Sequence, residues 1–377
     1  MSLTKKIESI AAFRIEMGKN IGGTIPAWSF GGNTVSALST GHLLPILSAQ
    51  HKGAIETFAD ESIEGKAFRD LPVLSGNSAN VDGIEINMRY DGMDRLLYWA
   101  LGYEDGGSSP QSLGGGYYSH LYELDRHERE DAAYRTDEQT AGDYSQYDRK
   151  NRFAVFARKM GTNDYRYPFL LCSSFAFSSA AQESLKMTVG GVALREDRGD
   201  YGSSSWTPAS LVAGSSKLIM HHHLTLSMGI AGSLVEIGVK DLNVSGEIPL
   251  FIDRDSESGL LIAKPVMSGA YNVTISFTIA RHSVDTYLQY RDDFQKCALK
   301  AEYESGDNLF GIYIPEGYLT EASVNEDDVA RQPITFTTGK PSTNPFTTEI
   351  GDHDLIQNGS MFIMTKNTNS VNEMRRE

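Results

Sequence analysis

The stretch from Val81 to Gly102, "VDGIEINMRYDGMDRLLYWALG", changes its hydrophobic period in the middle. Its first half alternates apolar with polar side chains, the pattern of a strand with one buried face. The alternating residues are Ile84, Glu85, Ile86, Asn87, Met88 and Arg89. After Asp91 and Gly92 the apolar residues recur at spacings of three and four, which predicts a short amphipathic helix. The residues of its apolar side are Met93, Leu96, Leu97, Trp99, Ala100 and Leu101.

A second stretch, "AYNVTISFTIARHSVDTYLQYRDDFQKCALKAEYES", repeats this change of period. Its alternating residues are Val273, Thr274, Ile275, Ser276, Phe277 and Thr278. A helical segment is expected to begin near Ser283 to Asp285. Its apolar side is formed by Tyr287, Leu288, Tyr290 and Phe294. The chain therefore passes from a half-buried strand into a helix twice.

The likeness between the two stretches extends to their flanks. "DLPVLSG" precedes the first alternating strand and "AKPVMSG" precedes the second. After each helix come a strand, a Gly/Asn/Asp turn and another strand, in "FAVFARKMGTNDYRYPFLL" and in "CALKAEYESGDNLFGIYIP". Each half then closes on an alternating strand, "SLKMTVGGVA" or "QPITFTTGK". We interpret this order as an internal duplication, with an acidic insertion at residues 103–151 in the first copy alone.

A chain of 377 residues exceeds the usual size of one core, and its 36 glycines and many Ser, Thr and Tyr residues favour strands and turns. We therefore expect a mainly β protein with two tandem units. The predicted divisions are an arm or loops with a strand or two at 1–50, a first unit at 51–200, a linker at 201–216, a second unit at 217–345 and a tail at 346–377. Within the acidic insertion, "YYSHLYEL" predicts one strand.

Charge and composition exclude several classes of protein. A net charge of −15 argues against a protein that binds nucleic acid through phosphate contacts, which need clustered Lys and Arg. The amino terminus does not resemble a secretory signal, and no apolar run is long enough to cross a bilayer, so we expect synthesis in the cytoplasm and no membrane partner. Two cysteines, Cys172 and Cys297, cannot form a disulfide framework, and both are interpreted as small buried apolar residues.

The search for catalytic or ligand-binding motifs is negative. At most His221 and His223 of the run at 221–223 could converge on a metal from a strand, and no partner ligand is fixed nearby, so a structural or chance run is favoured. "DRDSESG" has Ser258 and Lys264 where a calcium loop needs Gly and Glu. Glycines 114–116 precede a strand-like run rather than a helix, which makes them a weak phosphate loop. No catalytic, cofactor-binding or metal-binding residue is predicted, and an enzyme is not expected.

The ordered set of features resembles the tail tube, or major tail, proteins of tailed bacteriophages. The resembling stretches run from about Gly53 to Lys340. They are "VDGIEINMRYDGMDRLLYWALG", "GGGYYSHLYELD", "ESLKMTVGGVALRED", "HHHLTLSMG", "SLVEIGVKDLNVSGEIPLF", "AKPVMSGAYNVTISFTI" and "QPITFTTG". The insertion at 103–151 is longer than this family leads us to expect.

The resemblance implies a virion structural protein whose units are β-sandwiches or rolled sheets flanked by a helix. Subunits of that family form rings whose inner sheets join into a β-barrel, and the rings stack into a tube through which DNA passes. Since such rings usually contain six units, a chain with two units implies a trimer with pseudo-sixfold symmetry. Its other implied partners are further tail proteins, together with DNA that is not specifically bound, and no cofactor is implied.

The resemblance also gives roles to the two strand-helix stretches. Residues 84–89 and 273–278 become candidate barrel-wall strands, and closing a barrel between subunits would remove unpaired strand edges. The helices have two interpretations. Their apolar residues either pack on the sheet of their own unit or contact the next subunit. A different class remains open as well, a carbohydrate-binding or adhesin-like β-sandwich that uses the Tyr-rich insertion as its ligand surface.

Overall fold

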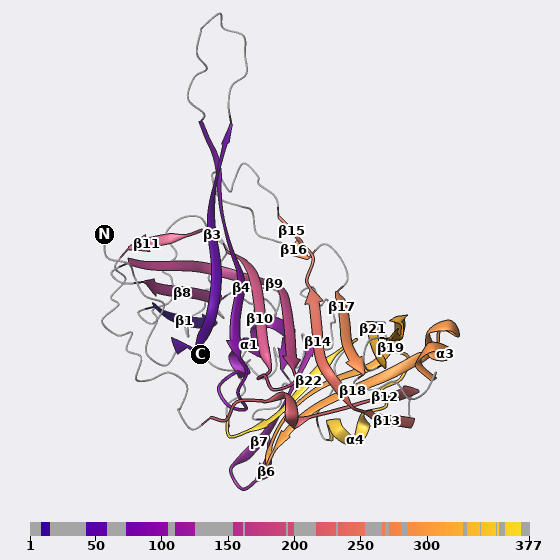
Figure 1. Ribbon diagram of the computed structural model, residues 1–377. Helices are drawn as coiled ribbons and strands as arrows, with labels where there is room; N and C mark the ends of the chain where they lie inside the picture. Colours follow the sequence, from indigo (N-terminus) through magenta and orange to yellow (C-terminus); the bar gives the residue numbers. More distant parts are fainter. Residues whose placement is uncertain are drawn as a thin grey trace, which may run out of the picture.

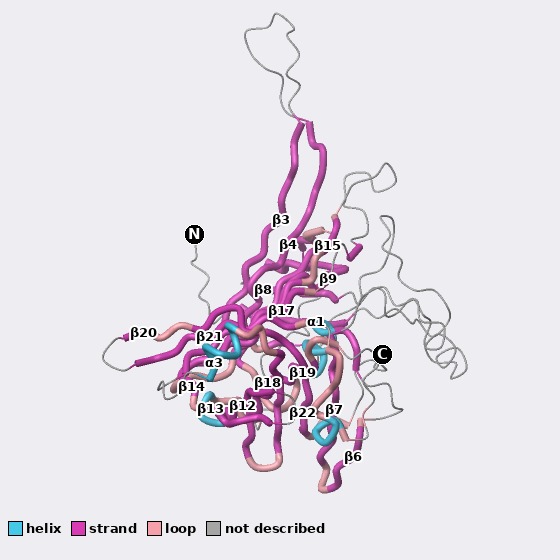
Figure 2. The backbone as a smooth tube through the Cα atoms, turned by 90° about the vertical axis from the view of Figure 1, so that its right-hand side faces the viewer, coloured by secondary structure: helices cyan, strands magenta, loops and turns pink. Residues whose placement is uncertain are grey.

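The computed structural model describes residues 9–15, 43–58, 73–104, 110–124, 154–160, 163–193, 195–199, 216–230, 233–252, 266–267, 271–279, 286–326, 330–339, 341–351, 353 and 359–370. These residues form a mainly β structure built on one open antiparallel sheet, with few and short helices. Figure 1 shows two groups of strands side by side and a narrow two-stranded arm that rises from the first group. Figure 2 shows the same arm from the side.

The first group of strands comes from the amino-terminal half of the chain. Its members are β1 (Ser9–Ile15), β2 (Leu43–Leu44), β3 (Ile46–Phe58), β4 (Val73–Asn87), β8 (Ala154–Met160), β9 (Asn163–Ala180), β10 (Lys186–Ala193) and β11 (Asp197–Gly199). Pairing runs in the order β3-β4-β10-β9-β8-β1-β2, and β11 pairs with the start of β9. The arm consists of β3 and β4.

The second group comes from the carboxy-terminal half. Its members are β12 (Leu224–Ile230), β13 (Ser233–Ile237), β14 (Val239–Glu247), β15 (Leu250–Phe251), β16 (Val266–Met267), β17 (Asn272–Ile279), β18 (Lys296–Ser305), β19 (Asn308–Ala322), β20 (Asn325–Glu326), β21 (Ala330–Thr338) and β22 (Phe362–Asn367). Pairing runs in the order β14-β17-β21-β19-β18-β12-β13, and β22 pairs with the start of β19. The two groups therefore have the same strand order.

The registers of the two groups agree as well. In the first group Ile46 pairs with Ile86, and the ladder shifts before its next pair. In the second group Val239 pairs with Ile279, followed by a shift at the same position. The first interruption of the ladder therefore lies at the same position in both groups.

Two further ladders carry matching shifts. The β9–β10 ladder shifts between Gly190 and Gly191, and the β19–β21 ladder shifts between Leu319 and Glu321. The β8–β9 ladder shifts between Ala154 and Phe156 of β8. The β18–β19 ladder shifts between Cys297 and Leu299 of β18, close to the start of that strand. The two halves thus share the order of strand pairs and several of the interruptions, although the β3–β4 and β4–β10 ladders carry further shifts that the β14–β17 and β17–β21 ladders lack.

The hairpins that follow β3 and β14 also correspond. Phe58 pairs with Val73 at the far end of the β3–β4 arm. Phe251 pairs with Val266 in the small β15–β16 sheet. The connecting segments between these pairs have equal length, although their residues from 59 to 72 and from 253 to 265 lie outside the described part of the chain.

The helix α1 (Asp94–Leu101) begins one residue after the predicted start and is buried on nearly every side. Its cover includes β7 (Tyr117–Leu124), the strand predicted within the acidic insertion, which pairs with β5 (Gly102–Glu104) and β6 (Gln111–Gly114). Of the insertion, residues 105–109 and 125–151 lie outside the described part. The apolar stripe read from the sequence therefore became core because strands of the insertion close over it.

The helix α3 (Thr286–Asp292) occupies the corresponding position in the second half, but none of its side chains is fully buried. Tyr287 and Leu288 pack partly against the core. Phe294, expected on the same apolar side, lies beyond the helix with a left-handed φ of 49° and is 78% exposed. The helix ends before Phe294, and the reversed backbone turns its ring outward, so that part of the prediction was wrong.

Residues 346–377, expected to form a tail, contain the helix α4 (Thr347–Ile350) and the strand β22. The strand lies between β19 and β7 and pairs with both. Asn367 at its end donates to buried Asp94 of α1 at 3.0 Å, and Tyr122 donates to the same carboxylate at 2.9 Å. The end of the chain thereby ties the second group of strands to the first.

Candidate assembly interface

The two groups of strands meet where β9 pairs with β14. This antiparallel ladder runs from Ser174 opposite Glu247 to Ala180 opposite Asp241. Backbone hydrogen bonds flank it, including one of 2.9 Å from Ile248 N to the Ser173 carbonyl. We call this ladder the internal joint. It makes the sheets of both groups one continuous surface (Figure 1).

The internal joint is closely packed around one glycine. A Cβ added to Gly246 would lie 2.2 Å from Cζ of Phe175, far inside van der Waals contact. Phe175 is itself buried and stands opposite Gly246 in the ladder. The missing side chain of Gly246 is therefore what allows the Phe175 ring to lie across the joint.

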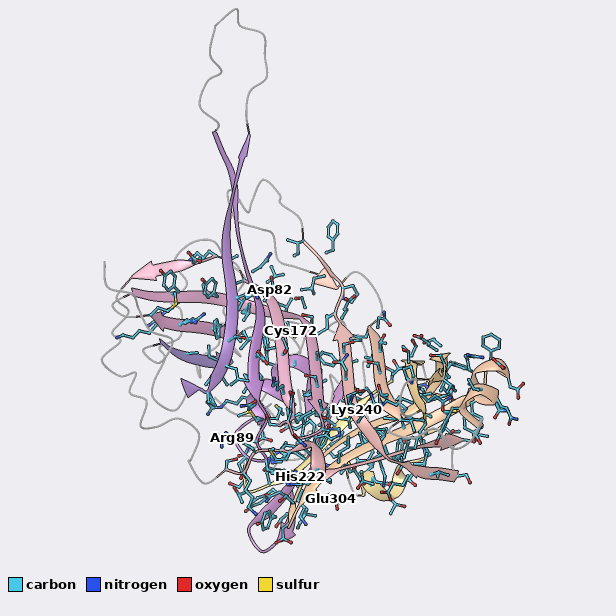
Figure 3. All side chains as sticks on the ribbon, viewed as in Figure 1. Asp82, Arg89, Cys172, His222, Lys240 and Glu304 are labelled. Atoms are coloured by element: carbon cyan, nitrogen blue, oxygen red, sulfur yellow. The ribbon has the colours of Figure 1, made fainter. Side chains whose placement is uncertain are left out.

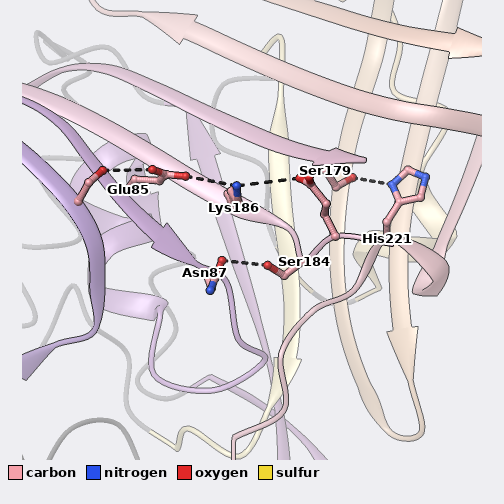
Figure 4. A network of polar contacts seen from close by, with 8 residues as sticks. Glu85, Asn87, Ser179, Ser184, Lys186 and His221 are labelled. Carbon is pink, nitrogen blue, oxygen red and sulfur yellow. Dashed lines mark hydrogen bonds and ion pairs between the residues drawn. The ribbon is translucent and has the colours of Figure 1, made fainter. Parts of the chain in front are cut away.

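Buried polar contacts connect the groups beside this ladder. The Ser179 hydroxyl lies 2.9 Å from Nδ1 of His221 (Figure 4). The same hydroxyl lies 2.8 Å from the Tyr303 hydroxyl. His221 Nε2 lies 3.3 Å from the Val239 carbonyl. With Nε2–H donated to that carbonyl, Nδ1 accepts from Ser179, and Ser179 in turn accepts from Tyr303, so that these three side chains are hydrogen-bonded to one another and to the Val239 carbonyl. Burial raises the pKa of Tyr303, so this hydroxyl stays protonated and able to donate.

The histidine run at 221–223 forms a short 3-10 turn rather than a strand. His223 accepts at Nδ1 from the Tyr90 hydroxyl at 3.0 Å. Burial, and the nearby His222 and Lys217, lower the pKa of His223. Within the described residues no group of three His, Cys, Asp or Glu side chains could hold a metal ion. The run is a structural element of the boundary between the two groups.

The alternating strands predicted from the sequence lie in the same rows of the sheet. Their apolar members are all buried, and their polar members are half-buried. The buried members are Ile84, Ile86, Met88, Val273, Ile275 and Phe277, and the half-buried members are Glu85, Asn87, Arg89, Thr274, Ser276 and Thr278. The predicted alternation is confirmed, whereas the role of these residues in a barrel wall stays a prediction.

Following the registers across six strands gives two polar rows on one face of the sheet. The first row is Glu85, Thr188, Ala176, Ser245, Thr274 and Thr337, and the second is Asn87, Lys186, Ser178, Asn243, Ser276 and Thr335. The only charged members, Glu85 and Lys186, lie 3.5 Å apart and neutralise each other (Figure 4). Ser48 donates to Glu85 at 3.1 Å, and Ser184 donates to Asn87 at 2.9 Å. We call this surface the polar face; it is rich in hydroxyl and amide groups and close to neutral.

The opposite face of the same strands is apolar. One row there consists of Ile86, Met187, Phe177, Val244, Ile275 and Phe336, all buried. Cys172, labelled in Figure 3, and Cys297 are free and buried, as predicted. Burial raises the pKa of Cys297 to about 11. The sheet thus has one polar face and one buried apolar face, and both faces continue across the internal joint.

Helix residues with a predicted packing or contact role fall into two sets. Met93, Leu96, Leu97 and Trp99 are buried in the core, and Trp99 Nε1 donates to the Leu170 carbonyl at 3.1 Å. These four residues pack within their own half. The second set consists of Tyr287, Leu288 and Phe294; the first two are half-buried and Phe294 is largely exposed.

Along the order β3-β4-β10-β9-β14-β17-β21-β19, both terminal strands have an unpaired edge among the described residues. In the part of the chain that the structure describes, β3 pairs with β4 alone. On one edge, β19 pairs with β18 only as far as Tyr318, which stands opposite Lys296. On the other edge, β19 continues to pair with β21 as far as Ala322. These two edges lie at opposite ends of the order that crosses the internal joint.

No helix among the described residues has both the length and the apolar character needed to cross a membrane. The calcium-like segment "DRDSESG" lies outside the described residues, and glycines 114–116 form a left-handed turn between β6 and β7 instead of a helix amino terminus. No protein-family model matches this chain, and neither does any curated protein.

Proposed function

We propose that this protein is a structural component of a phage tail tube, in which three chains form a ring with pseudo-sixfold symmetry and rings stack into a conduit for DNA. Each chain would contribute two tandem tube-like units, one from each group of strands, with residues 84–89 and 273–278 in the barrel wall. The observation that carries this proposal is the repeated strand order and register, joined into one sheet that remains open at both ends.

The repetition supports a ring because a joint between two like units can recur between chains. At the internal joint the second unit adds its β14 to the outer edge of β9 in the first. The first unit presents the corresponding strand β3, and the second unit presents β19, both with an edge free in the described residues. Such a head-to-tail surface closes into a ring when the rotation per unit divides a full turn.

The polar face supports a role as the wall of a water-filled channel. Its rows consist mainly of short hydroxyl and amide side chains, with one charged pair that cancels. Clustered Lys and Arg would hold the phosphates of passing DNA. The two polar rows contain one lysine, already paired with Glu85, and Arg89, just after the end of β4, donates to the Ser216 carbonyl. A chain of net charge −15 would also repel DNA at longer range.

Electron microscopy of the purified full-length protein tests the proposal. We expect stacked rings or tubes whose end views average with three-fold symmetry. Because only the first unit of each chain carries the insertion, every second unit of the ring should show extra density. A ring of six chains would contradict the trimer. Stable monomers that bind sugars would contradict the tube itself and favour the carbohydrate-binding alternative.

A further inference from the structure

One edge of β19 lacks the strand that its counterpart carries. In the first group β9 pairs with β8 up to Leu170 and then with β14 from Ser174 to Ala180 along the same edge. In the second group β19 pairs with β18 up to Tyr318, and in the described residues nothing follows on that edge. The position of the missing strand is therefore given by β14.

The matching registers define which residues would meet there. Ser245 of β14 stands opposite Ala176 of β9 in the internal joint. Counting from Ile46, the counterpart of Val239, Lys52 of β3 corresponds to Ser245. Counting from the matching register shifts, Ser323, the residue after β19, corresponds to Ala176.

Side chains of the same chain occupy backbone carbonyls in both free strands. Arg291 of α3 donates through Nη1 to the Ala322 carbonyl. Arg158 of β8 donates through Nη1 to the Ala49 carbonyl of β3 at 2.9 Å. In the internal joint the residue corresponding to Ala322 is Phe175. Since Ser173 already bonds to Ile248, alternation along an antiparallel ladder places Phe175 in the next hydrogen-bonded pair with Gly246.

We propose that β3 of a second copy of this chain adds antiparallel to the free edge of β19, with Lys52 opposite Ser323 and Gly53 opposite Ala322, and that Arg291 covers this edge before assembly. The inference rests on the proposed ring and specifies its joint. Gly53 N–H takes over the Ala322 carbonyl, and Arg291 is released to solvent beside Asp292, with which it already pairs at 2.7 Å. An edge held by an arginine is protected from indiscriminate strand pairing until the matching strand arrives.

Cysteine cross-linking tests the register. Lys52 and Ser323 would form a non-hydrogen-bonded pair, in which Cα atoms lie about 4.5 Å apart, suitable for a disulfide. We expect the variant with Lys52→Cys and Ser323→Cys to give inter-chain linked species up to three chains under mild oxidation. The variant with His51→Cys and Ser323→Cys places the two thiols on opposite faces of the sheet and should lose this linkage. As a positive control, Ala176→Cys with Ser245→Cys should link within one chain.

The outcomes separate this inference from the proposed function. Rings in micrographs without linkage of the matched pair, or with linkage of the slipped pair instead, would overturn the register while leaving the tube intact. Absence of both rings and linkage would overturn both proposals. Arg291→Ala should raise the rate at which rings form, as followed by light scattering, and an unchanged or lower rate would refute the protective role of Arg291.

Discussion

Replacing Gly246 with alanine should weaken the internal joint, because the new methyl group would collide with Phe175. The added Cβ would meet the Phe175 ring at 2.2, 2.5 and 2.9 Å, from three ring carbons. The backbone of both strands is held by the ladder, so relief requires Phe175 to leave its position in the core. Overpacking of this kind costs about 1–3 kcal/mol.

The size of the effect decides how it should be measured. The entropy of a protein rises by about 2.1 cal/mol/K per residue when it unfolds. In a chain of 377 residues, a loss of about 1–3 kcal/mol in the free energy of unfolding therefore lowers Tm by roughly 1–4 °C. Denaturant titration followed by circular dichroism is the better assay because the midpoint shift is larger than its error. Gly238→Ala is the matched control, since nothing lies within 4 Å of a Cβ at Gly238.

A double variant tests the cause. Phe175→Leu shortens the side chain that collides with the new methyl group, and it should recover part of the loss caused by Gly246→Ala. Coupling energies between contacting residues are typically about 0.5–3 kcal/mol. If Gly246→Ala and Gly238→Ala unfold at the same midpoint, or if the two changes at the joint add independently, the close packing of Gly246 against Phe175 does not hold the halves together.

Three further outcomes follow from buried polar groups. Tyr122→Phe removes a donor to buried Asp94 and should cost about 1–3 kcal/mol of unfolding free energy, measured by denaturant titration; no loss would mean that the bond from β7 to Asp94 does not stabilise the fold. Burial opposes the charge of Glu316, but hydrogen bonds from its partners, including Lys296 at 2.5 Å, lower its pKa. The stabilisation is therefore complete above the unfolded value of about 4.3 and is lost as pH falls through the lower folded value, so Glu316→Gln should flatten the acid limb of stability against pH. Since the pKa of Cys297 is raised to about 11, thiol reagents at pH 8 should label this residue in unfolded but not in folded protein, as read by mass spectrometry.

The alternation around Ile84 and Ile275 was readable from the sequence because burial of one face imposes a period of two on a strand. The helix after Met93 was readable for the same reason at a different period. The strand β7 was also predicted, since its aromatic and apolar residues stand between turns. Local burial patterns therefore gave the elements of both strand-helix stretches.

The neighbours of each strand were not readable in the same way. β14 could be identified as strand-like, but its pairing with β9 depends on residues far away in the chain. The same holds for β22, whose partners β19 and β7 come from opposite halves and whose short sequence lies in a region predicted as a tail. The backbone at Phe294 escaped prediction because an aromatic residue rarely adopts a left-handed conformation.

The helices α1 and α3 are covered to different extents, and this difference affects how many copies of another protein could bind to each ring. Strands β5 to β7 close over α1, whereas α3 stays half-exposed beside Phe294. In a ring of three chains the two kinds of outer surface would alternate, six units around but only three of each kind. A protein that docks on the insertion would then decorate the tube at three sites per ring, whereas one that recognises the shared sheet would find six.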